Sequence, residues 1–186
     1  MKKVLIVSGH TDLNNSFANK IILEKLERDL PEAAFDYLDK EYPDFAIDVK
    51  AEQKKLVDAD IIVLQFPVFW YSYPSLMHRW MEDVFEHGFS HGSKGKALVG
   101  KKLVASFTTG APEEMYVKNG PQLYPIDELV IPAIKSTANL CNMKFAGYVY
   151  TGGVSYASRP DAEKVKVMQA KAEAHAERLE ELLKTM

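Results

Sequence analysis

Three segments of this chain concentrate residues that could bind a ligand or act on one. They are GHTDLNNSF at residues 9–17, QFPVFWYSYPS at residues 65–75, and TTGAPEEMYVKNGPQ at residues 108–122. Each follows a short run of apolar, β-branched residues, which is typical of a buried strand. The three segments are therefore predicted to be loops at the ends of strands, where a rigid sheet can hold functional side chains.

The first segment points to phosphate binding. It contains neither G-x-G-x-x-G nor G-x-x-x-x-G-K-[ST], so it predicts neither a dinucleotide fingerprint nor a P-loop. It passes from a strand into a helix, where free N–H groups and the helix dipole favour an anion. The hydroxyl of Ser16 and the imidazole of His10 could add donors. Taken singly, Ser16 could be a helix cap and His10 a surface histidine; together they favour phosphate binding.

The second segment points to a flat ring. Five aromatic residues fall within the eight positions from Phe66 to Tyr73. Tryptophan and tyrosine in a loop make good walls for a planar ligand, and the loop backbone can meet the polar edge of the ring. The alternative is an aromatic cluster buried under the loop or in a contact between subunits. We favour ring binding.

The third segment offers donors to an anion. Gly110 tolerates an unusual backbone conformation and would let the backbone of Thr108 and Thr109 approach a ligand. The phenol of Tyr116 could donate to a developing negative charge. A lone tyrosine is more often a packed surface residue, so this segment is informative only beside the other two.

Other chemistries find no support. No metal site is expected, because His87 and His91 are four residues apart but straddle Gly88, which argues against one helix. A G-x-S-x-G elbow is absent, which argues against a serine hydrolase. The only cysteine, Cys141, lies in the apolar stretch LCNM and is expected to be a buried packing residue.

Charge and hydropathy argue against some classes of protein and indicate a cellular location. The formal net charge of −3 gives no support for nucleic-acid binding. No apolar run approaches the roughly 18–20 residues of a membrane span, and the N-terminus does not resemble a signal peptide. We expect a cytoplasmic protein with no direct membrane insertion.

The elements around these loops predict the fold. Strands are expected at residues 3–8, 34–39, 61–66, 102–108 and 145–151. Helices are expected from a cap at Asn14–Ser16 to Leu30, at 48–58, from Pro74 through Phe85, at 126–141, and from Pro160 to the end. No linker or repeat divides the chain, so residues 1–186 are expected to form a single domain. Alternating strands and helices predict a three-layer α/β sandwich with a parallel sheet of order 2-1-3-4-5.

At the three loops the sequence resembles the flavodoxin-like NAD(P)H:quinone oxidoreductase family. The resemblance runs nearly end to end and rests on GH…NSF, QFPVFWYSYPSLMHRW and SFTTGAPEEMY. The stretches KEYPDFAID and GKALVGKKL are similar to short bacterial members, which include stress-associated NAD(P)H oxidoreductases and ancillary subunits of potassium-efflux systems. The resemblance implies a flavodoxin-like fold and a homodimer with a flavin at each interface.

The resemblance also implies roles for single residues. His10, Ser16 and Phe17 would hold the phosphate end of the flavin, and Thr108, Thr109 and Gly110 would surround its pyrimidine edge. The isoalloxazine would contact Pro67, Val68, Phe69, Trp70 and Tyr71. Tyr116 matches the catalytic tyrosine, and Gln122 stands where the animal quinone reductases have a catalytic histidine. Those enzymes have a longer C-terminal region, so FMN is preferred here and FAD is the alternative.

The expected activity is ping-pong hydride transfer from NAD(P)H through the flavin to a quinone-like or other small aromatic acceptor. The rival interpretation is a flavin-binding ancillary subunit of a membrane potassium-efflux protein. A one-electron carrier is a weaker third option, because flavodoxins are usually more acidic. The apolar stripe of Met77, Trp80, Met81 and Phe85 is wider than one sheet face should need, which also favours a homodimer.

Overall fold

A five-stranded parallel sheet forms the centre of the computed structural model, which describes residues 2–186. The strands are β1 (Val4–Ser8), β2 (Ala34–Tyr37), β3 (Ile61–Pro67), β4 (Lys102–Thr108) and β5 (Lys144–Thr151). They pair in parallel in the order β2-β1-β3-β4-β5. The predicted strand order is therefore confirmed.

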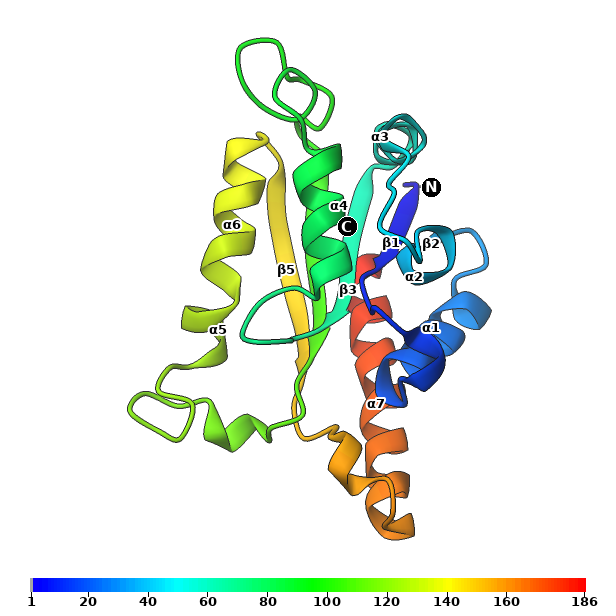
Figure 1. Cartoon of the computed structure of the whole chain (residues 1–186), viewed down its shortest axis with the longest axis vertical. Helices are drawn as coiled ribbons and strands as arrows, with labels where there is room; N and C mark the ends of the chain where they lie inside the picture. Colours follow the sequence, from blue (N-terminus) through cyan, green and yellow to red (C-terminus); the bar gives the residue numbers. More distant parts are fainter. Residues whose placement is uncertain (1) are drawn as a thin grey trace.

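Helices cover both faces of the sheet (Figure 1). One face carries α1 (Ala18–Asp29) and α7 (Ala162–Lys184), and the other carries α3 (Val49–Asp58), α4 (Ser75–Val84) and α6 (Ile131–Leu140). The remaining helical segments are short: η1 (Leu13–Asn15), α2 (Leu38–Glu41), η2 (Glu113–Met115), α5 (Ile126–Leu129) and η3 (Tyr156–Ser158). The predicted three-layer arrangement is confirmed, with more helical segments than the five expected.

Alternation along each strand divides the core in two. Ile62, Leu64 and Phe66 of β3 pack under α3 and α4, whereas Ile61 and Val63 pack under α1 and α7. Successive strand residues point to opposite faces, so a run that is apolar throughout must be covered on both sides. This is why the continuous apolar runs predicted central strands correctly.

Three predicted elements have other bounds in the structure. The strand expected at 34–39 ends at Tyr37, because Leu38 is buried in the core and starts the single turn of α2. That turn lets the Asp39 carboxylate accept a hydrogen bond from the Leu13 N–H at 2.7 Å. Local β-propensity is overridden here by a contact with a segment 26 residues away.

The helix expected at 126–141 is interrupted. Val130 ends α5 and precedes α6, with Pro132 in the first turn of α6. A proline ring disfavours helical continuation through the preceding turn, so one predicted helix becomes two.

The helix expected to begin with a cap at Asn14–Ser16 begins two residues later, at Ala18. Phe17 occupies the cap position and makes no capping hydrogen bond through its side chain. Asn14 and Asn15 belong to η1, whose cap is Asp12. Ser16 therefore caps no helix through its hydroxyl, which leaves that group free for another role.

The apolar stripe of α4 is used by the chain itself. Met77 and Trp80 are fully buried, and Met81 and Phe85 pack against the same core cluster. The argument that this stripe exceeds what one sheet face needs is therefore wrong. The extra apolar width is explained by α3, α2 and the loop after α4, which cover it from the sides. Cys141 is buried, as predicted, and burial raises the pKa of its thiol.

The carboxyl ends of the strands finish together. Ser8 is in register with Gln65, Pro67 with Thr108, and Thr108 with Thr151. The loops that follow β1, β3, β4 and β5 consequently start from one edge of the sheet. In an open parallel sheet this edge is where ligands bind, at the point where the strand order reverses.

Candidate functional site

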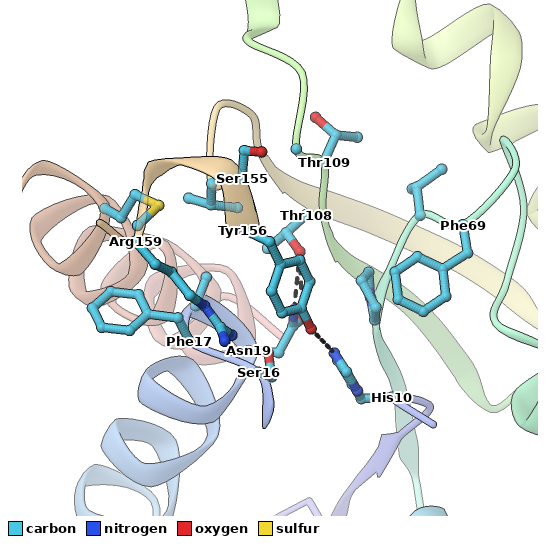
Figure 2. A pocket seen from close by; sticks show the side chains of 16 residues that line it. His10, Ser16, Phe17, Asn19, Phe69, Thr108, Thr109, Ser155, Tyr156 and Arg159 are labelled. Atoms are coloured by element: carbon cyan, nitrogen blue, oxygen red, sulfur yellow. Dashed lines mark hydrogen bonds between the residues drawn. The ribbon is translucent and has the colours of Figure 1, made fainter. Parts of the chain in front are cut away.

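A cavity of about 230 Å³ lies at this edge, between the loops that follow β1, β3, β4 and β5 (Figure 2). Nine of the residues predicted for a flavin site line it: His10, Ser16, Phe17, Pro67, Val68, Phe69, Thr108, Thr109 and Gly110. Three segments, residues 10–17, 67–69 and 108–110, are thus brought to one cavity, as the strand order predicts.

His10 enters the cavity as a neutral donor. Its Nδ1 accepts a hydrogen bond from the Asp12 N–H at 3.0 Å, so the ring proton resides on Nε2. Nε2 lies 3.3 Å from the Tyr156 hydroxyl, on the opposite wall of the cavity. Burial lowers the pKa of His10, which keeps the imidazole uncharged at neutral pH. His10 therefore supplies a directed N–H and no net charge.

The start of α1 supplies further donors. Ser16 is only 7% exposed, and no hydrogen bond among residues 2–186 uses its hydroxyl. The backbone N–H groups of the first turn of α1 have no partner within the helix, as at every helix start. This end of the cavity therefore combines a helix N-terminus with a serine that lines the cavity, which suits an anion.

Arg159 brings the one positive charge among the residues that line the cavity. Its guanidinium lies 4.1 Å from the centre of the Tyr156 ring and donates a hydrogen bond to the Asn15 carbonyl. Arg159 and Tyr156 come from the segment around η3, which reaches from β5 across the end of the cavity where α1 begins. None of the lining residues is acidic, so the net charge of the wall is positive.

Seven lining residues were not predicted: Ala18, Asn19, Val154, Ser155, Tyr156, Arg159 and Met168. Most of them belong to the loop after β5 or to α7. The sequence did offer a signal at the end of β5. The segment GGVSYASRPD follows this strand and contains hydroxyl, phenol and guanidinium groups. Any parallel strand adjacent to β4 must deliver its following loop to the same edge.

The loop between β3 and α4, here called the aromatic loop, contains a strained two-residue turn. Phe69 and Ser72 exchange both backbone hydrogen bonds at 3.1 Å, which leaves Trp70 and Tyr71 at the tip. Their φ angles are +49° and +65°, values that favour glycine or asparagine. Trp70 is 94% exposed. The turn therefore holds a large indole in solvent at the mouth of the site, at an energetic cost of order 1–3 kcal/mol per residue.

Four predicted site residues do not line the cavity within this chain: Trp70, Tyr71, Tyr116 and Gln122. They gather beside it. The Tyr71 hydroxyl donates to Gln122 Oε1 at 3.1 Å, which ties the aromatic loop to the loop after β4. Tyr116 packs edge-on against Tyr150 at 6.1 Å. Burial raises the pKa of Tyr116, so its phenol stays protonated and can act as a donor.

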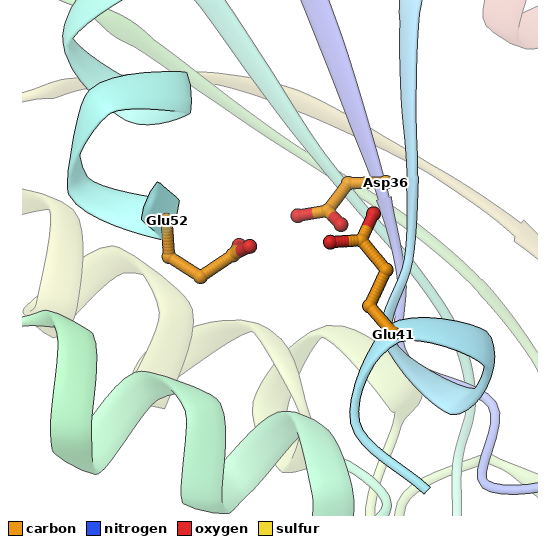
Figure 3. Close-up of side chains that lie close together, drawn as sticks. All are labelled: Asp36, Glu41 and Glu52. Carbon is orange, nitrogen blue, oxygen red and sulfur yellow. The ribbon is translucent and has the colours of Figure 1, made fainter. Parts of the chain in front are cut away.

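A separate cluster of carboxylates lies between β2, α2 and α3 (Figure 3). Asp36, Glu41 and Glu52 are the one group of three potential metal ligands within residues 2–186. The Lys55 ammonium already bonds all three, at 2.9, 2.7 and 2.7 Å. A cation of the chain itself thus occupies the position a metal would take, and the cluster is an internal ion-pair network remote from the cavity.

Within this cluster Asp36 and Glu52 share a proton. Glu52 accepts hydrogen bonds from Tyr42, Trp80 and Lys55, all at 2.7 Å, and is the ionised member. Asp36 Oδ2 is buried and receives no hydrogen bond from any group of residues 2–186, which is expected if it carries the proton itself. Burial, followed by the Glu52 carboxylate beside it, raises the pKa of Asp36 to about 8.

The raised pKa predicts a pH-dependent stability. Between about pH 5 and pH 7 the folded chain binds a proton at Asp36 that the unfolded chain, with an ordinary carboxyl pKa near 4, does not. The free energy of unfolding should therefore fall as pH rises through this range. Asp36→Asn should flatten that slope in urea denaturation, because asparagine can donate to Glu52 without titrating. A slope identical in both proteins would contradict the shared proton.

Comparisons with known proteins agree with the observed fold. The sequence profile of the flavodoxin-like fold family matches residues 2–178. The chain is 40% identical to general stress protein 14 of Bacillus subtilis, covering 86% of this chain and 90% of that protein. It is 37% identical to the NAD(P)H oxidoreductase YrkL of the same organism, covering 87% of this chain and 91% of YrkL.

Two further relatives bear on function. The ancillary protein KefG of the glutathione-regulated potassium-efflux system of Yersinia enterocolitica is 34% identical, over 98% of this chain and 95% of KefG. The crystal structure of general stress protein 14 from Treponema denticola in complex with FMN is 27% identical, with a TM-score of 0.77 over 94% of this chain and 99% of that one.

None of the helices in residues 2–186 combines the length and the apolar character that crossing a membrane requires. The sheet order, the cavity at the strand ends and the match over residues 2–178 agree with one another. The chain belongs to the flavodoxin-like fold family.

Proposed function

We propose that this protein is an NAD(P)H-dependent flavoprotein oxidoreductase that binds FMN and reduces quinone-like acceptors by ping-pong transfer of two electrons. The observation that carries the proposal is the cavity itself. One end combines a helix start, Ser16 and Arg159, and the other opens beside an aromatic turn. A ligand with a phosphate at one end and a flat ring at the other, joined by a short chain, matches these two ends.

The lining residues fit FMN in particular. Ser16, Arg159 and the start of α1 would bind the phosphate, and Thr108, Thr109 and Pro67 to Phe69 would surround the ring. The Arg159 guanidinium is held at this end by its hydrogen bond to the Asn15 carbonyl, where a terminal phosphate could meet it. The relative that contains a flavin holds FMN, which supports FMN over FAD. The flavin would supply the redox chemistry, accepting a hydride from NAD(P)H and passing it on.

The second substrate would bind outside the cavity, against the open end of the site. Its volume of about 230 Å³ is below the roughly 300–1,000 Å³ of pockets that enclose a whole drug-sized ligand. The ring end would therefore remain open toward Trp70, where a nicotinamide or an acceptor could stack. Such an open face accepts flat molecules in general, and quinones, azo dyes and nitroaromatics share that shape.

The direct test is the visible spectrum of the purified protein, with and without added FMN. We expect FMN to bind with a Kd tighter than about 10 μM, which corresponds to roughly −7 kcal/mol. Addition of NADPH or NADH without oxygen should then bleach the flavin absorbance. If neither FMN nor FAD binds at this level, the proposed function is wrong.

The similarity to KefG supports a second candidate function, a flavin-binding ancillary subunit of a membrane potassium-efflux protein. This role would need a specific complex with the transporter. Pull-down of a detergent-solubilised potassium-efflux transporter by the FMN-loaded protein would favour it. Fast reduction by NAD(P)H with rapid turnover of quinones, and no such complex, would favour the enzyme.

Tyr116 is expected to act on reduction more than on binding. Its protonated phenol could donate a hydrogen bond where negative charge develops, so its loss should fall mainly on the rate. A fully buried donor of this kind is worth about 2.7–4 kcal/mol, and this partly solvated position should give about 1–2 kcal/mol. Tyr116→Phe should therefore bleach about 5–30-fold more slowly with NADPH in stopped-flow measurements, with FMN affinity unchanged.

Two variants serve for comparison. Tyr148→Phe removes the hydroxyl of a partly exposed tyrosine of β5 that does not line the cavity, and it should leave bleaching unaffected. Gln122→Ala should matter less than Tyr116→Phe, because an amide cannot relay a proton as an imidazole can. A larger defect in Gln122→Ala would transfer the proton-handling role from Tyr116 to Gln122.

We also propose that the protein is a homodimer, on grounds other than the α4 stripe. The loops that follow β3 and β4 carry exposed apolar side chains, namely Trp70, Tyr71, Val117, Leu123 and Tyr124. The two loops that carry them are joined by the bond between Tyr71 and Gln122. A patch of this kind, next to an open ring site, is typical of a surface that another protein covers.

Light scattering at micromolar concentration should give about twice the monomer mass of 21.0 kDa. Leu123→Asp should shift the protein toward the monomer, because it places a charge in the patch. Val57→Asp is the matched control, since Val57 is an exposed aliphatic residue on α3, away from these loops. A wild-type monomer, or equal effects of the two variants, would contradict the proposed interface.

A further inference from the structure

A chain of buried hydrogen bonds runs from the cavity through the sheet to α7. In order it uses Thr108, Asn19, Gln65, Ser106, His175, Thr151 and Arg178. Thr108 and Asn19 line the cavity, and their bond of 3.1 Å is drawn in Figure 2. His175 is fully buried and reaches the cavity only through the residues between. The proposed mechanism assigns no role to it.

This chain of hydrogen bonds lies near the carboxyl ends of the strands, where the residues on one face of the sheet change from apolar to polar. On the face covered by α1 and α7, the next residue after Val63 is Gln65, two positions along β3. In the same way Ser106 comes after Val104 in β4. β5 shows the same change after Val149, with Thr151. Apolar packing in the middle of the sheet thus gives way to a polar layer beside the cavity.

Arg178 determines in which direction the groups of this hydrogen-bond chain donate. A guanidinium can only donate, and its Nη2 lies 2.6 Å from Thr151 Oγ1. The Thr151 hydroxyl therefore accepts from Arg178 and is free to give its own hydrogen to His175 Nδ1, at 2.9 Å. His175 must then carry its proton on Nε2, which lies 2.7 Å from Ser106 Oγ.

The remaining links follow in the same direction. Ser106 accepts from His175 and donates to Gln65 Oε1. The Gln65 amide donates to Asn19 Oδ1 at 2.9 Å, and the Asn19 amide donates to Thr108 Oγ1. Bonds aligned in one direction polarise and strengthen one another.

The reverse direction leaves a buried hydrogen without an acceptor. If His175 carried its proton on Nδ1, it would donate to Thr151, which already accepts from Arg178. The Thr151 hydrogen would then have no acceptor in a side chain that is almost fully buried. An unsatisfied buried donor of this kind costs about 1–3 kcal/mol. Burial, and secondarily Arg178, lowers the pKa of His175 to about 3, so the ring is neutral and carries a single proton.

The end of the chain decides what the cavity offers a ligand. Thr108 Oγ1 already accepts from Asn19, and its own hydrogen has only a distant alternative, Asn19 Oδ1 at 3.5 Å. We propose that His175 is a positioning residue that, through Ser106, Gln65 and Asn19, makes the Thr108 hydroxyl a donor toward an acceptor atom of the bound flavin. This inference rests on the proposed function.

The direction can be tested without any flavin. Long-range ¹H–¹⁵N NMR of the histidine-labelled apoprotein should show His175 as the neutral Nε2–H tautomer at pH 7. Arg178→Met, which removes the exposed anchor and should leave the fold intact, is expected to let the Nδ1–H tautomer appear. An Nδ1–H tautomer or an imidazolium in the wild-type protein would overturn the inference, whatever the protein binds.

The effect on the cavity can be measured as FMN affinity by fluorescence quenching. His175→Met should weaken FMN binding about fivefold, the size of one neutral hydrogen bond, whereas His175→Gln keeps a donor toward Ser106 and should stay within about twofold of wild type. In a Thr108→Val background the effect of His175→Met should vanish, because its route to the ligand has been removed. Additive losses in the double variant would show that His175 is merely structural and would overturn the proposal.

If His175→Met fails to fold, Arg178→Met takes its place in the same cycle. Its smaller loss of affinity, about twofold, should also disappear in the Thr108→Val background, and persistence of that loss would overturn the proposal. A wild-type protein that binds no flavin would instead refute the proposed function, while the tautomer measurement would still decide the direction of the chain.

Discussion

Replacing Lys55 with methionine is expected to lower the free energy of unfolding by about 2–4 kcal/mol at neutral pH. The Lys55 ammonium bonds Asp36, Glu41 and Glu52, and the first and last of these carboxylates are fully buried. Removing one partner of a buried ion pair costs about 3–5 kcal/mol, because the remaining charge is left without compensation. Lys55 itself is 30% exposed, so water can replace part of its contribution and the expected loss is somewhat smaller.

Urea denaturation of Lys55→Met should show the loss as a lower midpoint with an unchanged slope. Lys54→Met is the matched control on the same helix. Lys54 pairs with Asp58 at the surface, where both side chains are mostly exposed, so its replacement should have little effect. Equal midpoints for the two variants would mean that the buried cluster is held together without its lysine.

Replacing Arg159 with glutamine is expected to weaken FMN binding about 10–100-fold and to leave riboflavin binding within about twofold of wild type. Arg159 is the one charged side chain that lines the cavity, since His10 is kept neutral by burial. A hydrogen bond to a charged group contributes about 1.5–3 kcal/mol, and every 1.4 kcal/mol is a factor of ten in affinity. Riboflavin lacks the phosphate, so it should not detect the change.

The comparison of the two ligands separates charge from structure. If Arg159 only held its segment against Asn15, loss of that contact would weaken FMN and riboflavin alike. Lys164→Gln is the matched control, because Lys164 is an exposed cation in the first turn of α7, near the same end of the molecule. An equal effect of Lys164→Gln on FMN would indicate a general electrostatic attraction in place of a specific contact.

Much of the fold is determined by sequence alone, because its main signals are local. The apolar runs around Ile62 and Val104 must be buried on both faces, and breakers such as Pro67 and Pro74 separate strand from helix. Alternation of strands and helices with right-handed connections then leaves few topologies, and for five strands the order 2-1-3-4-5 is the simplest of them. That order by itself predicts that the loops after β1, β3 and β4 share one edge.

What a side chain faces across the sheet depends on tertiary structure. The pattern of α4 marks Met77 and Trp80 as apolar, but whether the chain's own core or a second copy covers them depends on where α3 and the neighbouring loops pack. Likewise, Lys55 is one of two adjacent lysines in sequence. Only the packing of α3 against β2 turns it toward Asp36 while Lys54 stays in solvent.

The cavity shows the same division. His10, Ser16 and Thr108 could be predicted because each follows a strand whose burial is evident from its own residues. Arg159 could be found only through its place in the loop after the last predicted strand, and His175 could not be found, because neither its residue type nor its spacing is unusual. Each meets the site only when β5 pairs with β4 and α7 packs across the sheet, more than 140 residues after His10 in the case of Arg159. Strand burial is a short-range property of the chain, whereas the pairing of distant polar groups exists only once the layers have assembled.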